Sequence, residues 1–476
     1  MEEQINESNR PVNSRRKKRT QMQIFKETYL PAIIAGIAII LIIVFIIGSI
    51  TRAVQKNKAE KEASIAASSA AEAEGARLEQ AAQNLIAQAS KLMASYDYDG
   101  AIALLNSFEG DISKFPAVND KILECEAAQK QMVTWSDPSQ IPNLSFQLLV
   151  ADPSRAFKHT TYGHSINRNF ITTEEFSKIL QQLYDNGYIL VDFDDFISTS
   201  TGLDGSTVYK IKELKLPNGK KPIMLTQTNV NYNYYLIDGD GDKSPDANGA
   251  GIASKLLWNG HSFSNELVDA NGQTVTGDFD LVPILEKFIQ KHPDFSYRNA
   301  RATLALTGYN GLFGYRTHPS AKETFGEAEY NQALRDAQKV VSALRNKGYT
   351  LACYTYENIG YGDSSLTQIK GDMNHWTEEV VPVLGHTDIL TYAQLSDISS
   401  EPVYSGEKYE ALRDLGFRYY LGFCEDGAPW ATITDNYVRQ GRLMVTGSNL
   451  AHHSEWFTGM FDASSVLDSS RGNVPN

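Results

Sequence analysis

The chain has 476 residues, a formal net charge of −13 at pH 7 and 42% hydrophobic residues. This length allows about two to three domains, and the excess of acidic residues argues against a nucleic-acid partner. The three cysteines, Cys125, Cys353 and Cys424, lack metal-binding or redox spacing, which excludes a fold held together by disulfides but leaves a Cys353–Cys424 bridge open.

An uncharged apolar segment, Tyr29–Ile50, lies near the N-terminus. As a helix it would extend about 33 Å, enough to cross a hydrocarbon core of roughly 30 Å. Seven basic residues precede the segment and four follow it closely, so the positive-inside rule predicts a cytoplasmic N-terminus and an extracellular body. A cleaved signal peptide is the alternative, but the run is long and no small-residue cleavage site closes it. We predict a single-pass cell-membrane protein with a basic tail over 1–28 and a transmembrane helix over 29–51.

Residues 52–75 are rich in Ala, Glu and Lys and lack a continuous apolar stripe, which predicts a semi-rigid helical stalk. Over 76–133 the apolar spacing is helical but is interrupted at Tyr96-Asp97-Tyr98-Asp99, which predicts a helical hairpin. The run Tyr98-x-x-Ala101-Ile102 resembles a single degenerate tetratricopeptide unit. One such unit cannot bury both faces, so we expect it to pack on the next domain, on the stalk or on a protein partner. We favour a spacer as its role.

From residue 134 onward, short β-rich runs alternate with helical patterns. The expected strands are 144–150, 188–192, 222–225, 302–306, 350–353, 389–392 and 419–423, and the expected helices are 173–186, 281–291, 327–347 and 408–415. This alternation predicts parallel β/α units. In an enzyme of this plan, reactive residues lie just after the C-terminal ends of the strands.

Several stretches of 134–476 match a known family. They include Tyr184-Asp185-Asn186-Gly187-Tyr188, His292-Pro293-Asp294-Phe295, Leu304-Ala305-Leu306-Thr307-Gly308-Tyr309, Gly314-Tyr315-Arg316-Thr317 and Arg439-Gln440-Gly441-Arg442. On these stretches the region resembles the polysaccharide deacetylase (NodB-homology) family, with a long insertion after the second strand. The resemblance implies an α/β fold, a distorted (β/α)7-type barrel with a groove for a sugar polymer.

The resemblance also implies metal-assisted removal of an acetyl group. In the family a divalent ion such as zinc, held by one Asp and two His, activates water while a second Asp acts as base. In this sequence the base position is Thr228, and the three ligand positions are Asn229, Tyr354 and Asn358. These side chains offer neither a carboxylate nor an imidazole, so we expect no tightly bound metal and loss of the deacetylase reaction.

Two acidic segments are candidates for separate metal sites. Asp238, Asp240, Asp242 and Asp246 have the alternating carboxylates of a calcium loop, but Lys243 and Gly249 stand where that loop requires Gly and Glu. We favour a solvated turn, with weak calcium binding as the alternative. Asp192-Phe193-Asp194-Asp195 follows a strand, and we interpret it as the cap of the next helix.

The resemblance would place a set of aromatic and polar side chains on or near the groove: Asn231, Tyr232, Tyr309, Tyr315, Arg316, Tyr354, Tyr356, Glu357 and Tyr392. Aromatic rings pack against the apolar faces of sugars, although ordinary packing explains many such residues equally well. Our leading hypothesis is a catalytically inactive protein that binds envelope polysaccharide or peptidoglycan, or docks a partner. The competing hypothesis is an active hydrolase or deacetylase with a rebuilt site that uses Glu357, Asp363 or Asp397.

Overall fold

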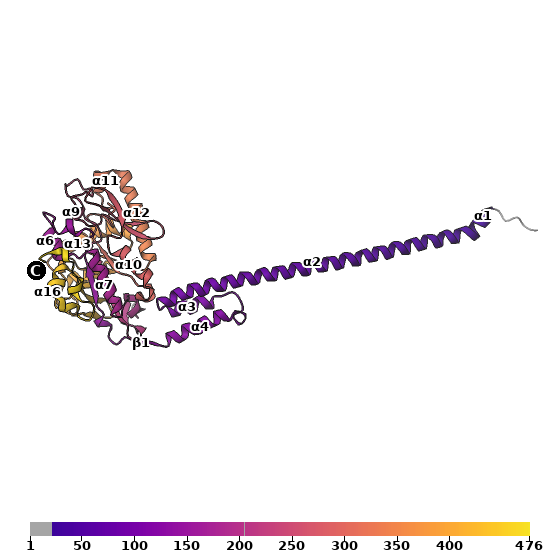
Figure 1. Cartoon of the computed structure of the whole chain (residues 1–476), viewed down its shortest axis with the longest axis horizontal. Coiled ribbons are helices and arrows are strands. Elements are labelled where there is room, and N and C mark those ends of the chain that lie inside the picture. Colours follow the sequence, from indigo (N-terminus) through magenta and orange to yellow (C-terminus); the bar gives the residue numbers. More distant parts are fainter. Residues whose placement is uncertain (1–20, 204) are drawn as a thin grey trace, which may run out of the picture. The chain divides into compact units, whose positions relative to one another are not determined.

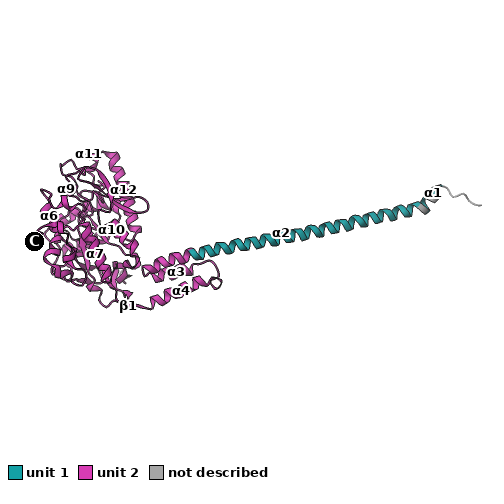
Figure 2. Cartoon of the chain, in the orientation of Figure 1, with its two compact units in different colours: residues 1–83 teal, residues 84–476 magenta. Residues whose placement is uncertain are grey.

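The computed structural model describes residues 21–203 and 205–476, so most of the expected basic tail lies outside the described residues. The chain divides into two compact units, Met1–Gln83 and Asn84–Asn476 (Figure 2). The described part of the first unit is helical. It comprises α1 (Gln21–Ile24), a π-helical turn (Phe25–Tyr29) and most of α2 (Leu30–Ala94), which continues into the second unit.

Helix α2 contains both the expected membrane span and the expected stalk. Within the described residues, this helix together with the preceding turn is the one segment long and apolar enough to cross a membrane. Its apolar side chains are exposed, with Phe45 at 73% and Leu41 at 62%. A membrane anchor and a signal segment both have these properties, so anchoring and orientation stay predictions.

The region of the predicted helical hairpin is helical, and its helices are the last turns of α2, which ends at Ala94, followed by α3 (Tyr98–Asn106) and α4 (Pro116–Gln129). We call α3 and α4 the helical hairpin; its standing as a separate domain stays a prediction. Asp97 caps α3, which explains the break in the apolar pattern at this position. The segment before α3 contacts the larger domain, because Arg298 donates a backbone hydrogen bond to the Ser95 carbonyl at 2.7 Å and the Tyr96 ring stacks on Tyr297.

The larger domain is built on a closed barrel of seven parallel strands, in the order β11-β12-β13-β14-β16-β2-β7 and back to β11. The strands are β2 (Asn143–Phe146), β7 (Lys221–Thr228), β11 (Thr303–Leu306), β12 (Thr350–Cys353), β13 (Ile389–Thr391), β14 (Tyr419–Phe423) and β16 (Val438–Met444). The predicted (β/α)7-type barrel is thus confirmed. Because all seven strands run in parallel, their C-terminal ends gather at one mouth.

Helices surround the barrel (Figure 1). The principal ones are α7 (Thr173–Asp185), α10 (Leu281–Lys291), α12 (Glu327–Asn346), α13 (Leu366–His375) and α15 (Glu407–Asp414). Helix α7 begins with a capping box between Thr172 and Glu175 and buries Phe176, Ile179 and Leu183 on one face. The apolar faces of these helices and the outward side chains of the strands form the main core.

Polar side chains connect neighbouring strands inside the barrel. Asn143 donates to Gln440 at 3.0 Å and accepts from Thr226 at 2.8 Å, so one chain of hydrogen bonds joins β2, β7 and β16. All three residues are buried. Their hydrogen bonds satisfy polar groups that would otherwise be costly in this position.

The remaining strands lie outside the closed barrel, and β3 (Tyr188–Leu190) is the one among them that was predicted. It pairs with the first half of β7, whereas β15 (Ala431–Ile433) is an additional antiparallel partner of β16. The insertion after β7 contains α9 (Tyr234–Ile237) and an antiparallel sheet of β8 (Lys255–Trp258), β9 (Phe263–Val268) and β10 (Thr274–Gly277). Two further pairs are β1 (Met132–Thr134) with β6 (Lys215–Pro217) and β4 (Ile197–Thr201) with β5 (Thr207–Ile211). Asp192 caps α8 (Phe193–Phe196), as interpreted from the sequence.

Candidate functional site

A cavity of about 660 Å³ opens at the mouth of the barrel, and we call it the barrel-mouth cavity. It is lined by residues at or just beyond the ends of six of the seven barrel strands and by residues of α6 (Gly163–Asn169) and α16 (Gly447–His452). Six amide side chains line it: Gln147, Asn169, Asn229, Asn358, Gln394 and Asn449. The aromatic residues of the lining are Phe170, Tyr235, Tyr354, Phe423 and Trp456. Amides and aromatic rings together can bind both the hydroxyl groups and the apolar faces of a sugar.

The residues at the family's ligand positions meet in this cavity. Asn229 follows β7, and Tyr354 and Asn358 follow β12, and all three line the cavity. Thr228, at the base position, is fully buried at the end of β7 and donates to the Phe146 carbonyl at 3.2 Å. The structure therefore brings the predicted ligand positions together, although the side chains present differ from those of the family.

The side-chain oxygens of Asn229 and Asn358 differ in how they are satisfied. Asn229 Oδ1 accepts hydrogen bonds from Asn233 at 2.9 Å and from Thr307 at 3.4 Å. Asn358 Oδ1 is buried and has no hydrogen-bond partner within the described part of the chain. An unsatisfied buried acceptor costs about 1–3 kcal/mol. Because Asn358 lines the cavity, a ligand N–H or O–H group is a suitable donor for this oxygen.

The backbone around the cavity is strained. Asn229, Thr355, Asn358, Gln394 and Leu395 all have left-handed backbone conformations, with φ between 52° and 60°. Asparagine tolerates this region, but it is unfavourable for a β-branched residue such as Thr355. Strain of this kind persists where the surrounding structure imposes it and is concentrated at functional sites.

A tightly held divalent ion does not fit the residues of the barrel-mouth cavity. Among the described residues that line it, the one carboxylate is Glu425, which is exposed, and no histidine lines it. Asn229 already uses its amide oxygen within the fold, and the phenol of Tyr354 is a poor ligand while protonated. The lining also contains Cys424, but burial raises the pKa of this thiol to about 12, so it is not available as a thiolate. Amides, one phenol and one protonated thiol do not provide the ligands that zinc requires.

A buried arginine lies beside one of the ligand positions. Arg442 of β16 is fully buried, and its guanidinium carbon is 6.0 Å from the centre of the Tyr354 ring. It donates to the carbonyls of Gly422 at 2.9 Å and Tyr392 at 2.8 Å and to Ser145 Oγ at 3.2 Å. Its fixed positive charge makes the neighbouring cavity less favourable for a metal cation.

Of the nine side chains that the resemblance would place near the groove, Tyr354 lines the barrel-mouth cavity. Asn231, Tyr232 and Tyr392 are fully buried. The other five lie outside the lining of the cavity: Tyr309, Tyr315, Arg316, Tyr356 and Glu357. Tyr232 donates to Asp280 at 2.6 Å, and burial raises the pKa of this carboxyl. Tyr356 donates to Glu379 and stacks on His375. These contacts account for Tyr232 and Tyr356 by packing within the fold.

Most of the amides and aromatic rings in the cavity were missed by sequence reasoning. They come from separate strand ends, from α6, α9 and α16, and from a 3-10 turn (Ser454–Phe457), so no short motif contains them. The available indication in the sequence was that a polar residue follows the end of a predicted strand. Gln394 and Glu425 follow the ends of β13 and β14, where a parallel barrel places functional groups.

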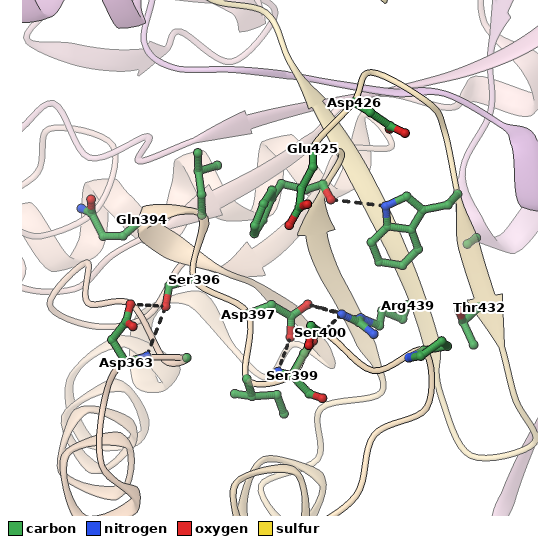
Figure 3. Close-up of a pocket in the computed structure, with 17 residues that line it drawn as sticks. Asp363, Gln394, Ser396, Asp397, Ser399, Ser400, Glu425, Asp426, Thr432 and Arg439 are labelled. Carbon is green, nitrogen blue, oxygen red and sulfur yellow. Dashed lines mark hydrogen bonds and ion pairs between the residues drawn. The ribbon is translucent and has the colours of Figure 1, made fainter.

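A second cavity, of about 1060 Å³, lies between the loops after β13 and β14, and we call it the flank cavity (Figure 3). It shares Gln394, Leu395, Phe423 and Glu425 with the barrel-mouth cavity. Asp397 points toward Arg439, which donates to it at 2.9 Å, and it also accepts from Tyr404 at 2.6 Å. Asp363 accepts from Ser396 at 2.7 Å.

These contacts bear on the hypothesis of a rebuilt hydrolase. Glu357 is exposed and lines neither cavity. The Asp397 carboxylate is neutralised by Arg439, with both side chains at most 10% exposed. Asp363 and Asp397 thus make hydrogen bonds that hold the loop after β13, and the geometry does not favour an acid–base pair built from these three residues.

The acidic loop and the cysteines complete the set of predicted site residues. Carboxylate oxygens of Asp238, Asp240 and Asp246 lie within 4.8 Å of one another, whereas Asp242 is outside this group. Asp238 accepts backbone hydrogen bonds from Gly241 and Lys243 at 2.6 and 2.7 Å. Calcium binding by this loop stays a prediction. The three cysteines are buried and unpaired, so the Cys353–Cys424 bridge is not formed.

Comparison with known proteins gives one similar solved structure to report. No protein-family model matches the chain, and no curated protein matches it. A structure of the Streptococcus pyogenes deacetylase PplD in complex with acetate aligns with 66% of this chain and 95% of its own, at 13% sequence identity and a TM-score of 0.33. A match this weak assigns neither family nor activity, and family membership stays a prediction.

Proposed function

We propose that the barrel-mouth cavity binds an envelope glycan and does not carry out metal-assisted deacetylation. The observation that supports this proposal is the lining of the cavity, in which six amide side chains and five aromatic rings surround positions where the family resemblance requires metal ligands. Amides donate to and accept from sugar hydroxyl groups without adding charge, and aromatic rings cover sugar faces.

The unpartnered oxygen of Asn358 gives this proposal a specific contact. In the free protein this buried acceptor lacks a donor, and a sugar hydroxyl or acetamido N–H group would provide one. Asn358 therefore contributes more to binding than to folding. The apolar N-terminal helix is consistent with a place at the membrane, where envelope polymer is available.

The test is a calorimetric titration of the full chain, in lipid nanodiscs, with an N-acetylhexosamine tetrasaccharide. Asn358→Gly removes the side chain at a φ of 58°, which glycine adopts without strain, so the free energy of unfolding changes by less than about 1 kcal/mol. We expect this variant to bind the tetrasaccharide about fivefold more weakly, because it loses the binding free energy of about one hydrogen bond.

The matched control is Lys243→Gly, which also removes a side chain from a left-handed backbone position, at a φ of 67°, in a loop outside the cavity. This variant should bind like the unaltered chain. Absence of saturable binding by the unaltered chain, or equal binding by the Asn358→Gly variant, argues against the proposal. Release of acetate that a chelator abolishes would contradict the proposal that the cavity does not carry out metal-assisted deacetylation.

A further inference from the structure

The charged groups of the barrel-mouth cavity are few and unevenly placed. Arg168 of α6 and Glu425 after β14 are the charged side chains of its lining, and both are exposed. Within the described part of the chain, Arg168 has no hydrogen-bond or ion-pair partner, so its guanidinium is available to a ligand. At the rim, therefore, one positive and one negative charge face water.

Beneath the rim, the buried charge beside the cavity is positive. Arg442 is fully buried, and its three hydrogen bonds go to two carbonyl oxygens and one hydroxyl, all of them neutral. Buried charges are normally paired, because an uncompensated charge in a medium of low polarity is costly. Asp397 is the carboxylate whose charge acts on Arg442, but Arg439 lies 2.9 Å from Asp397 and already neutralises it.

The two arginines act on the cavity in different ways. The exposed charges of Arg168 and Glu425 are screened by solvent, and they offset each other at long range. The charge of Arg442 is less screened because it is buried, and it adjoins Tyr354, which lines the cavity. The interior of the cavity is therefore more favourable for an anionic group than for a neutral or cationic one.

We infer that the glycan held in the barrel-mouth cavity carries an anionic group, of which a carboxylate is the class we favour. In this arrangement Arg168 donates hydrogen bonds to the carboxylate, and Arg442 supplies a fixed positive charge below it. Asn358 accepts from a hydroxyl group of the same saccharide. The inference rests on the proposed function and names the chemical class of its ligand.

The test compares three probes of equal length on the full chain in lipid nanodiscs: a neutral N-acetylhexosamine tetrasaccharide, a tetrasaccharide containing uronic acid, and a tetrasaccharide carrying a phosphate ester. We expect the uronic-acid probe to bind about tenfold more tightly than the neutral one, because it gains the binding free energy of a hydrogen bond to a charged group. Higher salt should reduce this difference.

Two exposed substitutions assign the effect to the cavity without disturbing the core. Arg168→Gln should weaken binding of the uronic-acid probe by about tenfold, and Glu425→Gln should strengthen it about twofold to fivefold by removing a like charge. Arg335→Gln, an exposed arginine of α12 outside the cavity, is the control and should bind the probe like the unaltered chain.

The outcomes separate this inference from the proposed function. Equal affinity for the neutral and uronic-acid probes, unaffected by Arg168→Gln, overturns the inference and leaves glycan binding intact. Tightest binding of the phosphate probe, sensitive to Arg168→Gln, supports the anionic class and identifies phosphate as its source. Failure of all three probes to bind overturns both proposals.

Discussion

At the scale of single residues, His318 gives the fold a specific dependence on pH. His318 lies near Tyr234 and Ser320, at 3.3 and 2.9 Å from their hydroxyl oxygens. Burial, with a smaller contribution from Arg316, lowers its pKa from 6.5 to about 4. The folded state therefore binds the proton less well than the unfolded state does. Its contribution to stability is present above about pH 6.5 and is lost as the pH falls toward 4.

Replacement of His318 by Asn should remove this contribution. We expect the free energy of unfolding of the unaltered chain to fall between pH 6.5 and 4 by about 1–2 kcal/mol more than that of the Asn variant, after allowance for partial solvent screening. Urea unfolding of both proteins across this range measures the difference. Glu379 and Lys243 also act on His318, so parallel curves for the two proteins would mean that other groups control the titration.

The sequence predicted where the site lies better than what lines it. Asn229, Tyr354 and Asn358 line the barrel-mouth cavity, and each follows a strand whose apolar run is easily read. Their correspondence to the family's ligand positions stays a prediction. The amides Asn169 and Asn449 were not predicted, because they meet the other lining residues only when separate elements fold together. Arg442 belongs to a stretch that resembles the family, but its burial was not predicted, since an arginine is ordinarily exposed.

At the scale of elements, prediction succeeded where strands are apolar and failed where they are polar. The bounds of β12, β14 and α10 agree with the expected ranges, because buried parallel strands are continuous apolar runs and α10 has one apolar face. β16 was not predicted as a strand. Its side chains include Arg439, Gln440 and Arg442, which bind polar groups inside the fold and interrupt the apolar pattern.

The contact between the helical hairpin and the barrel domain can be tested at Tyr96. Its ring stacks on Tyr297 at 6.3 Å, and the next contact is the hydrogen bond from Arg298 to Ser95. Tyr96→Ala should remove about 1–3 kcal/mol of packing energy and loosen the hairpin locally. Hydrogen exchange should become faster in α3 and α4 while the barrel strands remain protected.

Leu123→Ala on α4 is the matched control, because this side chain is 54% exposed and should contribute little. Unchanged exchange in α3 and α4 of the Tyr96→Ala variant would show that the stacking is not what holds the hairpin. Faster exchange throughout the barrel would mean that the hairpin and the barrel unfold as one cooperative unit.

At the scale of the whole molecule, a closed parallel barrel provides a mouth in which side chains from distant parts of the sequence meet. The apolar stretch of α2 is long and apolar enough to cross a membrane, and the barrel has a cavity lined with amides, aromatic rings and few charges. Because one fold supports many functions, what this barrel binds depends on the side chains that line its cavity.

The central claim is that glycan binding at the barrel mouth does not depend on a metal. The most direct measurement is the affinity of the metal-stripped full chain for the neutral N-acetylhexosamine tetrasaccharide, repeated after addition of zinc, with acetate measured in the same samples. We predict saturable binding with the same Kd in both conditions and no acetate release. Binding that appears only with zinc, or acetate released on its addition, would contradict the claim.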